Sequence, residues 1–207
     1  MIVVDIETSG VDINKCGIWQ IGAVDTDNPK NIFLDEGRID EEDILLFDMK
    51  GKKTTPEKLF GKSESDLRDK KKKSQKELLI NFFKWCESCK IKVFVCQNPQ
   101  FDFTFLETKA FKYNLKFSID YHAFDLHSIA QIAYKRVNGE FLFEKDHSGL
   151  GLSKILDFVG MKDNRKEHNA LEDAKLTSEA FFRLVYGKNL LEEYSKFKLS
   201  EYIQQEK

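Results

Sequence analysis

Two acidic residues stand two positions apart near the start of the chain, in the run VVDIET. The residues before them are apolar, and a short apolar run that ends in acids is typical of a buried strand. Side chains alternate along a strand, so Asp5 and Glu7 would share one face while Ile6 occupies the other. Neighbouring carboxylates repel each other, which raises their pKa values. We interpret the pair either as a solvated strand end or as part of a cation site.

A third candidate acid follows a later apolar run. The run KVFVCQ, residues 92–97, predicts another buried strand, and Asn98-Pro99 interrupts it. Asp102 comes just after this break, where an acid can cap the N-terminus of a helix. Taken alone, Asp102 is compatible with capping and with a share in a cation site.

The segment HNALEDA places a histidine five residues before an aspartate, where a helix is predicted to begin. With Asn169 as the N-cap, Glu172 falls at the third helical position, which resembles a capping box. Asp173 then lies in the first turns, on the side of small residues, and an acid there suggests a chemical role. His168 precedes the helix, either as a surface histidine or as a loop residue that reaches a reacting group.

The elements that must position these residues follow from hydrophobic periodicity. Strands are expected over 2–7, 17–26, 31–39, 92–97 and 121–126. Helices are expected over 55–60, 75–89, 101–113, 127–137, 151–160 and 169–186, followed by an amphipathic segment over 189–205. Three antiparallel strands followed by alternating helices and strands predict an α/β fold, with a mixed sheet flanked by helices. We divide the chain into a domain over 1–187 and a C-terminal helical extension over 188–207, which packs on the domain or contacts a partner.

Composition excludes several classes of protein. The 207 residues are 41% hydrophobic and 13% aromatic, which is too apolar for a disordered chain. The net charge of −2 argues against a passive nucleic-acid coat, although bound cations would supply positive charge locally. No apolar run approaches the roughly 20 residues that span a bilayer, so no membrane contact is expected. A start without a signal sequence, and four cysteines interpreted as reduced thiols, predict a cytoplasmic location.

Together these segments resemble the three motifs of the DEDDh family of 3′–5′ exonucleases, which have a ribonuclease-H-like fold. VVDIETSG resembles the first motif, NPQFDFTFL the second and HNALEDAKLT the third. The histidine five residues before the last aspartate is similar to the h branch of the family rather than to the tyrosine branch. The resemblance covers roughly residues 1–186. Within the family, the chain resembles the proofreading exonuclease subunits of bacterial replicative DNA polymerases and ribonuclease T-like enzymes.

The resemblance implies a site with two divalent cations, Mg²⁺ or Mn²⁺, held by the four acids Asp5, Glu7, Asp102 and Asp173. It also implies that His168 is the general base that takes a proton from the attacking water. The expected reaction is hydrolysis of phosphodiester bonds at the 3′ end of single-stranded DNA or RNA, with release of 5′-mononucleotides. A second copy of the chain or a polymerase is a possible partner of the C-terminal segment.

Residues beside the motifs are expected to contact the terminal nucleotide. By resemblance, the backbone of the residues after the first acidic pair would meet it, namely Thr8, Ser9 and Gly10. Two positions in the early strand run 17–26 and two in the second motif are candidates either for contact with bases or for core packing: Ile18, Trp19, Phe101 and Phe105. Asn98 matches a polar position of the second motif.

Three residues depart from those common in the family: Gln97, Pro99 and Asn169. They leave the acids intact, but they leave open the choice between DNA and RNA. One alternative to an active exonuclease is a catalytically inactive module that binds nucleic acid or a partner protein. Another is a different hydrolase or transferase on the same fold. The complete set of four acids and a histidine argues against the first, and the spacing of His168 and Asp173 argues against the second.

Overall fold

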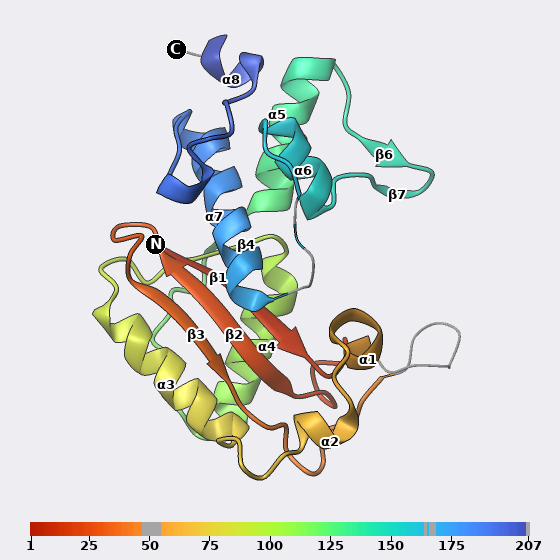
Figure 1. Cartoon of the computed structure of the whole chain (residues 1–207), viewed down its shortest axis with the longest axis vertical. Coiled ribbons are helices and arrows are strands. Elements are labelled where there is room, and N and C mark those ends of the chain that lie inside the picture. The colour runs from red at the N-terminus through yellow and green to blue at the C-terminus, as the bar shows by residue number, and fades with distance from the viewer. Residues whose placement is uncertain (47–54, 164, 166–168, 206–207) are drawn as a thin grey trace.

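The centre of the molecule is a five-stranded sheet in the order β3-β2-β1-β4-β5 (Figure 1). The structure is a computed structural model, and it describes residues 1–46, 55–163, 165 and 169–205. The first three strands, β1 (Ile2–Thr8), β2 (Ile18–Asp25) and β3 (Ile32–Glu36), are antiparallel. The other two, β4 (Phe94–Cys96) and β5 (Ala123–Asp125), continue the sheet in parallel with β1. The predicted α/β fold with a mixed sheet is confirmed.

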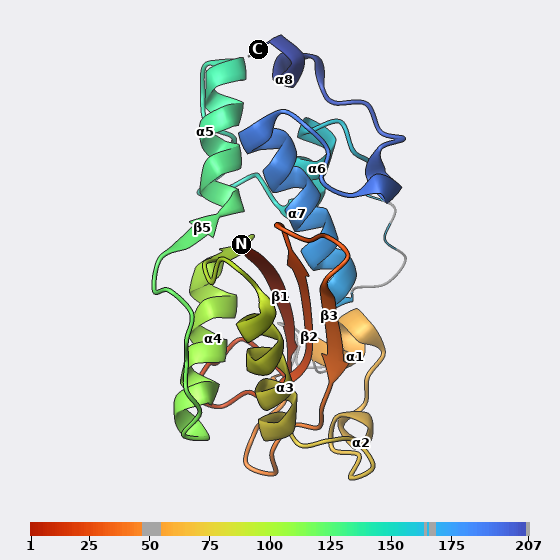
Figure 2. The ribbon, with the colours of Figure 1, turned by 90° about the vertical axis from the view of Figure 1, so that its left-hand side faces the viewer.

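Helices cover both faces of the sheet (Figure 2). One face carries α3 (Gln75–Ser88) and α4 (Pro99–Lys112); the other carries α7 (Ala170–Tyr186), with α5 (Leu126–Asn138) and α6 (Leu152–Phe158) beside it. Side chains of β1 alternate between the two layers: Val4 and Ile6 pack toward α3 and α4, and Val3 packs toward α7. Since Asp5 and Glu7 are in phase with Val3, β1 presents both carboxylates to the α7 layer.

Several element boundaries differ from those predicted. Helix α4 begins at Pro99 rather than at residue 101, because proline is well suited to the first helical turn. A hairpin of β6 (Phe143–Glu144) and β7 (His147–Ser148) was not predicted, since strands of two residues show no detectable alternation. Two short helices, α1 (Thr55–Phe60) and α2 (Glu64–Leu67), lie between β3 and α3.

The C-terminal segment after α7 packs against α5, α6 and α7. It contains a 3₁₀ turn, η1 (Glu192–Tyr194), and a short helix, α8 (Glu201–Gln205). Its apolar side chains join the core on that face, among them Tyr194, Phe197 and Ile203.

All four cysteines are buried and free of disulfides. Within the described part of the chain, no helix combines the length and apolar character that crossing a bilayer requires.

Candidate active site

Three carboxylates from β1 and α7 converge beside the sheet. One oxygen atom from each of Asp5, Glu7 and Asp173 lies within 4.8 Å of the other two. Glu7 and Asp173 are buried, with 8% and 7% of their surface exposed. Carboxylate oxygens at such separations suit hard divalent cations such as Mg²⁺ and Mn²⁺. The fold therefore brings together three of the four predicted acids, although Asp5 and Asp173 are 168 positions apart in the sequence.

Asp102 approaches β1 at the point where strand pairing stops. β4 pairs with β1 at Ile2 and Val3 and ends at Cys96. Beyond that end, Asp102 Oδ1 accepts a hydrogen bond from the backbone N–H of Ile6 at 3.1 Å. The N-cap position of α4 is Asn98, so capping is not the role of Asp102. Asp102 lies outside the group of three. Among the neighbouring charges, however, it has the largest effect on the pKa of Asp5, which it raises.

Burial raises the pKa values of Asp5, Glu7 and Asp102, and repulsion from neighbouring charges adds to this effect at Asp5 and Glu7. Burial, helped by the charges of Asp173 and Asp102, raises the pKa of Glu7 to about 9. Burial, and then the charges of Asp102 and Glu7, raise the pKa of Asp5 well above its ordinary value. Burial also raises the pKa of Asp102 to about 7. A cation among these groups would relieve both the desolvation and the repulsion, so the environment favours cation binding.

The raised pKa values predict that the metal-free protein loses stability between pH 6 and pH 8. Glu7 and Asp102 have pKa values of about 9 and about 7 in the folded state, far above those of unfolded carboxyls. The folded state therefore binds more protons than the unfolded state in this range, and the free energy of unfolding falls as pH rises. Urea titrations in the presence of chelator, followed by circular dichroism, should show a lower midpoint at pH 8.

The control for this prediction is Glu7→Gln, in which the pH dependence should shrink. Added Mn²⁺ should also reduce it, because a bound cation stabilises the ionised carboxylates. A midpoint that is equal at pH 6 and pH 8 in the chelated wild-type protein would contradict the assignment of raised pKa values.

A guanidinium group already lies among the acids. Arg165 Nη1 donates to Asp173 Oδ1 at 2.7 Å, and the same side chain pairs with Asp163 at 2.5 Å. The charge of Arg165 lowers the pKa values of Asp5 and Glu7, against the larger effect of burial. Arg165 thus partly neutralises the cluster from within the chain. Sequence patterns gave no indication of this residue, because it lies outside the three motifs.

Replacing Arg165 is expected to tighten the binding of divalent cations. A cation that coordinates Asp173 through Oδ1 competes with the Arg165 hydrogen bond, and hydrogen bonds between charged groups contribute about 1.5–3 kcal/mol. Arg165→Gln should therefore bind Mn²⁺ about tenfold more tightly in isothermal titration calorimetry. Its chelated form should melt at a lower temperature, because the acids lose their neutralising group.

Arg136→Gln, at an exposed position of α5, provides the matched control for this prediction and should leave both quantities unchanged. Equal Mn²⁺ affinity in Arg165→Gln and in the wild-type protein would show that Arg165 does not compete with the cation.

The predicted general base, His168, lies outside the described residues. The residue after it is the N-cap of α7: Asn169 Oδ1 accepts hydrogen bonds from Leu171 N at 3.0 Å and Glu172 N at 3.4 Å. The helix that carries Asp173 therefore begins at Ala170, two positions after His168 in the sequence. The role of His168 as a base stays a prediction.

The turn that follows the first acidic pair is closed by its own hydrogen bonds. Ser9 is fully buried; its N–H donates to Gly17 O at 2.8 Å, and its carbonyl accepts from Leu46 N at 3.1 Å. The Ser9 hydroxyl donates to Ile44 O at 2.7 Å. The expected contact between the Ser9 backbone and a nucleotide is not supported, because these groups already have protein partners. Thr8 is also buried, and its hydroxyl donates to Gly10 O at 2.7 Å.

The candidate base-contacting residues lie mostly in the core. Ile18 and Phe105 are fully buried, and Trp19 is 2% exposed. Trp19 packs with Ile39 and Leu67, and its ring meets that of Phe60 edge to face. In this structure these side chains belong to the packing and present no open face to a base. Phe101 is only partly buried, with its ring centroid 4.9 Å from that of Phe105, and Asn98 is exposed.

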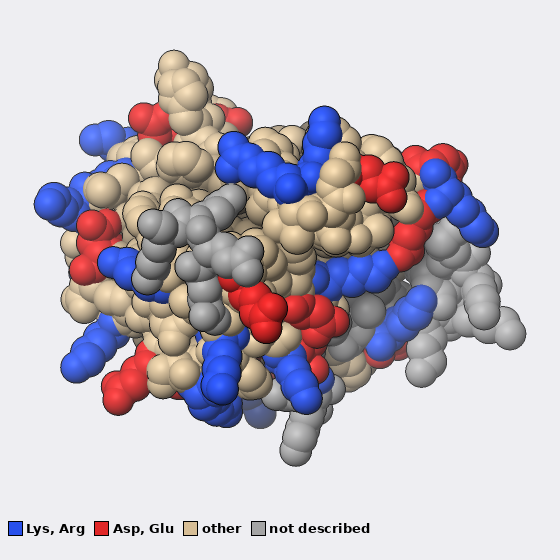
Figure 3. All heavy atoms as spheres, turned by 90° about the horizontal axis from the view of Figure 1, so that it is seen from above, with Lys and Arg blue, Asp and Glu red and all other residues tan. Residues whose placement is uncertain are grey.

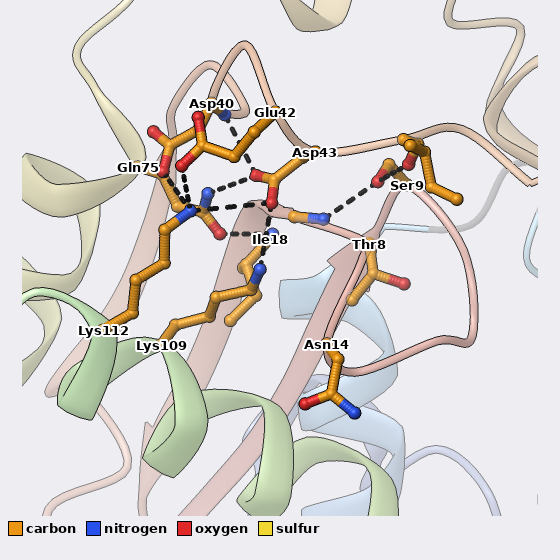
Figure 4. Close-up of polar contacts among 12 residues, drawn as sticks. Thr8, Ser9, Asn14, Ile18, Asp40, Glu42, Asp43, Gln75, Lys109 and Lys112 are labelled. Atoms are coloured by element: carbon orange, nitrogen blue, oxygen red, sulfur yellow. Dashed lines mark hydrogen bonds and ion pairs between the residues drawn. The ribbon is translucent and has the colours of Figure 1, made fainter.

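A buried polar network holds the loop over residues 37–46, which bonds to Ser9 through Ile44 and Leu46 (Figure 4). Lys109 Nζ donates to Asp43 Oδ1 at 3.0 Å, and each side chain is 2% exposed. Gln75 Nε2 donates to the other oxygen of Asp43 at 2.7 Å, and Gln75 Oε1 accepts from Ile18 N at 2.7 Å. The network attaches the loop to α3, α4 and β2. Its members are widely separated in sequence, so no local pattern predicted it.

The face of the molecule seen from above is not dominated by positive charge (Figure 3). On the face shown in Figure 3, lysine and arginine side chains are distributed among acidic ones rather than gathered in one patch. This agrees with the net charge of −2.

The fold is similar to those of several solved nucleases. Cell-death related nuclease 4 (CRN-4) superposes with a TM-score of 0.66 at 15% identity, over 91% of this chain and 64% of that one, so the chain spans less than two thirds of that protein. The nuclease domain of 3′hExo, a DEDDh family member bound to rAMP, gives a TM-score of 0.58 at 14% identity, over 97% of this chain and 95% of that one. A 3′-exonuclease in a structure of histone mRNA stem-loop recognition gives 0.57 at 14% identity, over 92% and 83%.

At these identities the likeness concerns the fold, and it confirms the predicted ribonuclease-H-like architecture. A comparison with curated protein sequences finds no match. The sequence model of the exonuclease family RNase_T matches residues 2–181, which is most of the chain and includes all four predicted acids. The chain therefore belongs to the RNase_T exonuclease family, as the resemblance of its motifs to DEDDh exonucleases predicted.

Proposed function

We propose that the protein is a metal-dependent 3′–5′ exonuclease that hydrolyses single-stranded DNA or RNA and releases 5′-mononucleotides. The observation that carries this proposal is the convergence of Asp5, Glu7 and Asp173 within 4.8 Å, with Asp102 beside them. The family match supports an exonuclease activity for this cluster. An inactive binding module would have no chemical need for four neighbouring acids, three of them buried and one partly buried.

The donor set fits divalent cations. It consists of carboxylate oxygens, which suit Mg²⁺ and Mn²⁺, and Arg165 already brings one positive charge to Asp173. Asp5, Glu7 and Asp173 would hold the cations, with Asp102 completing the set. When bound, two such cations activate a water molecule and stabilise the departing 3′ oxygen of the scissile phosphate.

The chain itself would supply the proton acceptor and the binding surface. His168, close to Asp173 in sequence, would accept the proton of the attacking water, a role suited to a group that titrates near neutrality. Two similar structures are described by their binding of rAMP and by recognition of the 3′ end of histone mRNA. By that analogy we propose that this site also receives the 3′ end of a nucleic acid.

The direction and substrate can be tested with end-labelled oligonucleotides. Single-stranded DNA, RNA and duplex DNA carrying a 5′ label would be incubated with Mg²⁺, Mn²⁺ or chelator. Cleavage from the 3′ end should yield a ladder of progressively shorter labelled products, and only when metal is present. A 3′ label should instead be released at once as a mononucleotide.

Circular single-stranded DNA is the control for endonuclease activity and should survive. Immediate release of a 5′-labelled mononucleotide would contradict the proposed direction. Tight binding to every substrate without cleavage in any condition would support the alternative of an inactive binding module.

A further inference from the structure

A row of polar side chains leads away from the acidic cluster across the sheet. In the strand register Glu7 lies opposite Gln20, and Gln20 lies opposite Glu36, so the three side chains share one face of β1, β2 and β3. Gln20 Nε2 donates to Glu36 Oε1 at 2.8 Å, and Lys72 Nζ donates to Glu36 Oε2 at 3.2 Å. Gln20 is 4% exposed, so its amide group depends on these protein partners.

The other end of the Gln20 amide binds the helix that carries Asp173. Gln20 Oε1 accepts a hydrogen bond from Ala170 N, the first residue of α7, at 2.9 Å. The next two N–H groups of α7 bond to the Asn169 side chain, and Asp173 N bonds to Asn169 O. Among these first-turn donors, only Ala170 is held by the sheet rather than by the adjacent residue. Gln20 therefore attaches the helix start to the strand next to Glu7.

Close packing limits the position of the same helix turn. Gly22 lies opposite Asp5 in the register, and a Cβ atom added there would be 2.1 Å from Leu171 N. The backbone of α7 thus rests directly on β2. Asp173 follows Ala170 by three residues, about one helical turn, so a shift of the helix start displaces its carboxylate relative to Asp5 and Glu7.

The chemistry at position 20 requires both halves of an amide. Ala170 N can only donate, and the Glu36 carboxylate can only accept, so the side chain between them needs one acceptor and one donor. Glutamine meets both needs in one orientation. An apolar residue would leave a buried N–H and a carboxylate without these partners.

We propose that Gln20 is a positioning residue, which sets Asp173 against Asp5 and Glu7 and thereby determines the affinity of the acidic cluster for divalent cations. The inference rests on the proposed function, because it assumes that these acids bind metal. Partners that orient metal ligands typically change metal affinity by about 10–100-fold when they are replaced.

The test compares Gln20→Met with a matched substitution elsewhere. Gln131 is also buried, and its amide bonds to Leu142 and Ser148, remote in sequence from the acids. Gln20→Met and Gln131→Met should both lower the urea midpoint. Only Gln20→Met should weaken Mn²⁺ binding, by about tenfold or more in isothermal titration calorimetry. Gln20→Met should also lower kcat, with little change in KM for the oligonucleotide.

A charge exchange provides the rescue experiment. In the double variant Gln20→Glu with Glu36→Gln, the new glutamate can still accept from Ala170 N, and the new glutamine at position 36 can donate to it. Both hydrogen bonds are then restored, so Mn²⁺ affinity should return to within a few-fold of wild type. Wild-type Mn²⁺ affinity in Gln20→Met would overturn the positioning role, as would a loss of affinity in Gln131→Met equal to that in Gln20→Met. If the wild-type protein itself binds no Mn²⁺ and degrades no substrate, the proposed function fails instead.

Discussion

Asp5→Asn is expected to abolish nuclease activity and at the same time to raise the melting temperature of the metal-free protein. Asp5 is the acid on which burial, Asp102, Glu7 and Asp173 all act to raise the pKa. Asparagine has nearly the same shape but no charge, so the substitution removes repulsion from a buried cluster. It also removes a cation ligand. Cation stabilisation of the transition state is worth several kcal/mol, which corresponds to a loss of about a thousandfold or more in rate.

Two measurements together test this expectation. Thermal melts in chelator should show a higher midpoint for Asp5→Asn than for wild type, and the shift that Mn²⁺ produces in the wild-type melt should largely disappear in the variant. Asp157→Asn, an exposed position on α6, serves as the control and should change neither quantity nor the rate. Retention of more than a tenth of the wild-type rate by Asp5→Asn would remove Asp5 from the proposed ligand set.

Arg183→Met is expected to destabilise the protein by about 3–5 kcal/mol, because it leaves a buried glutamate without its counter-charge. Arg183 and Glu179 are both fully buried on α7, with Arg183 Nε donating to Glu179 Oε1 at 2.9 Å. The guanidinium also donates to the carbonyls of Tyr194 at 3.1 Å and Phe197 at 3.0 Å. On the other side of the pair, Glu179 Oε2 accepts from Leu190 N and Leu191 N, both at 2.9 Å.

These bonds attach the C-terminal segment to α7, so the variant should also loosen that segment. Urea unfolding followed by circular dichroism gives the loss of stability, and limited proteolysis should show earlier cleavage after residue 187. Lys154→Met removes an ion pair with Glu144 whose side chains are 47% and 60% exposed, and it should cost no more than about 1 kcal/mol. The conclusion that Arg183 attaches the C-terminal segment to α7 is falsified if Arg183→Met is no less stable than Lys154→Met.

Local patterns in the sequence were sufficient for most of the longer strands and helices and for part of the site. Alternation along β1 correctly placed Asp5 and Glu7 on the same face, because a strand repeats every two residues wherever it lies. Asn169 was correctly identified as the N-cap of α7, because capping depends on the few residues around the helix start. The order of strands and helices, together with the three motifs, predicted the family and the sheet.

Other features of the site depend on where β4 and α7 meet β1 and β2. The contact of Asp102 with Ile6 joins residues 96 positions apart, and it exists because β4 ends early. The contact of Gln20 with Ala170 spans 150 positions. The sequence could not separate a buried Trp19 or Ser9 from a substrate-facing one, since a buried position and a substrate-contact position can show the same local pattern.

The sequence by itself therefore determined the five strands of the main sheet and the longer helices, the family and the identity of the candidate acids. Tertiary structure alone decided that Arg165 lies against Asp173, that Ser9 closes a turn, and that Gln20 connects the sheet to α7. The physical reason is the range of the interactions. Periodicity and capping act within a few residues, whereas hydrogen bonds and charge contacts between distant segments depend on how whole elements pack.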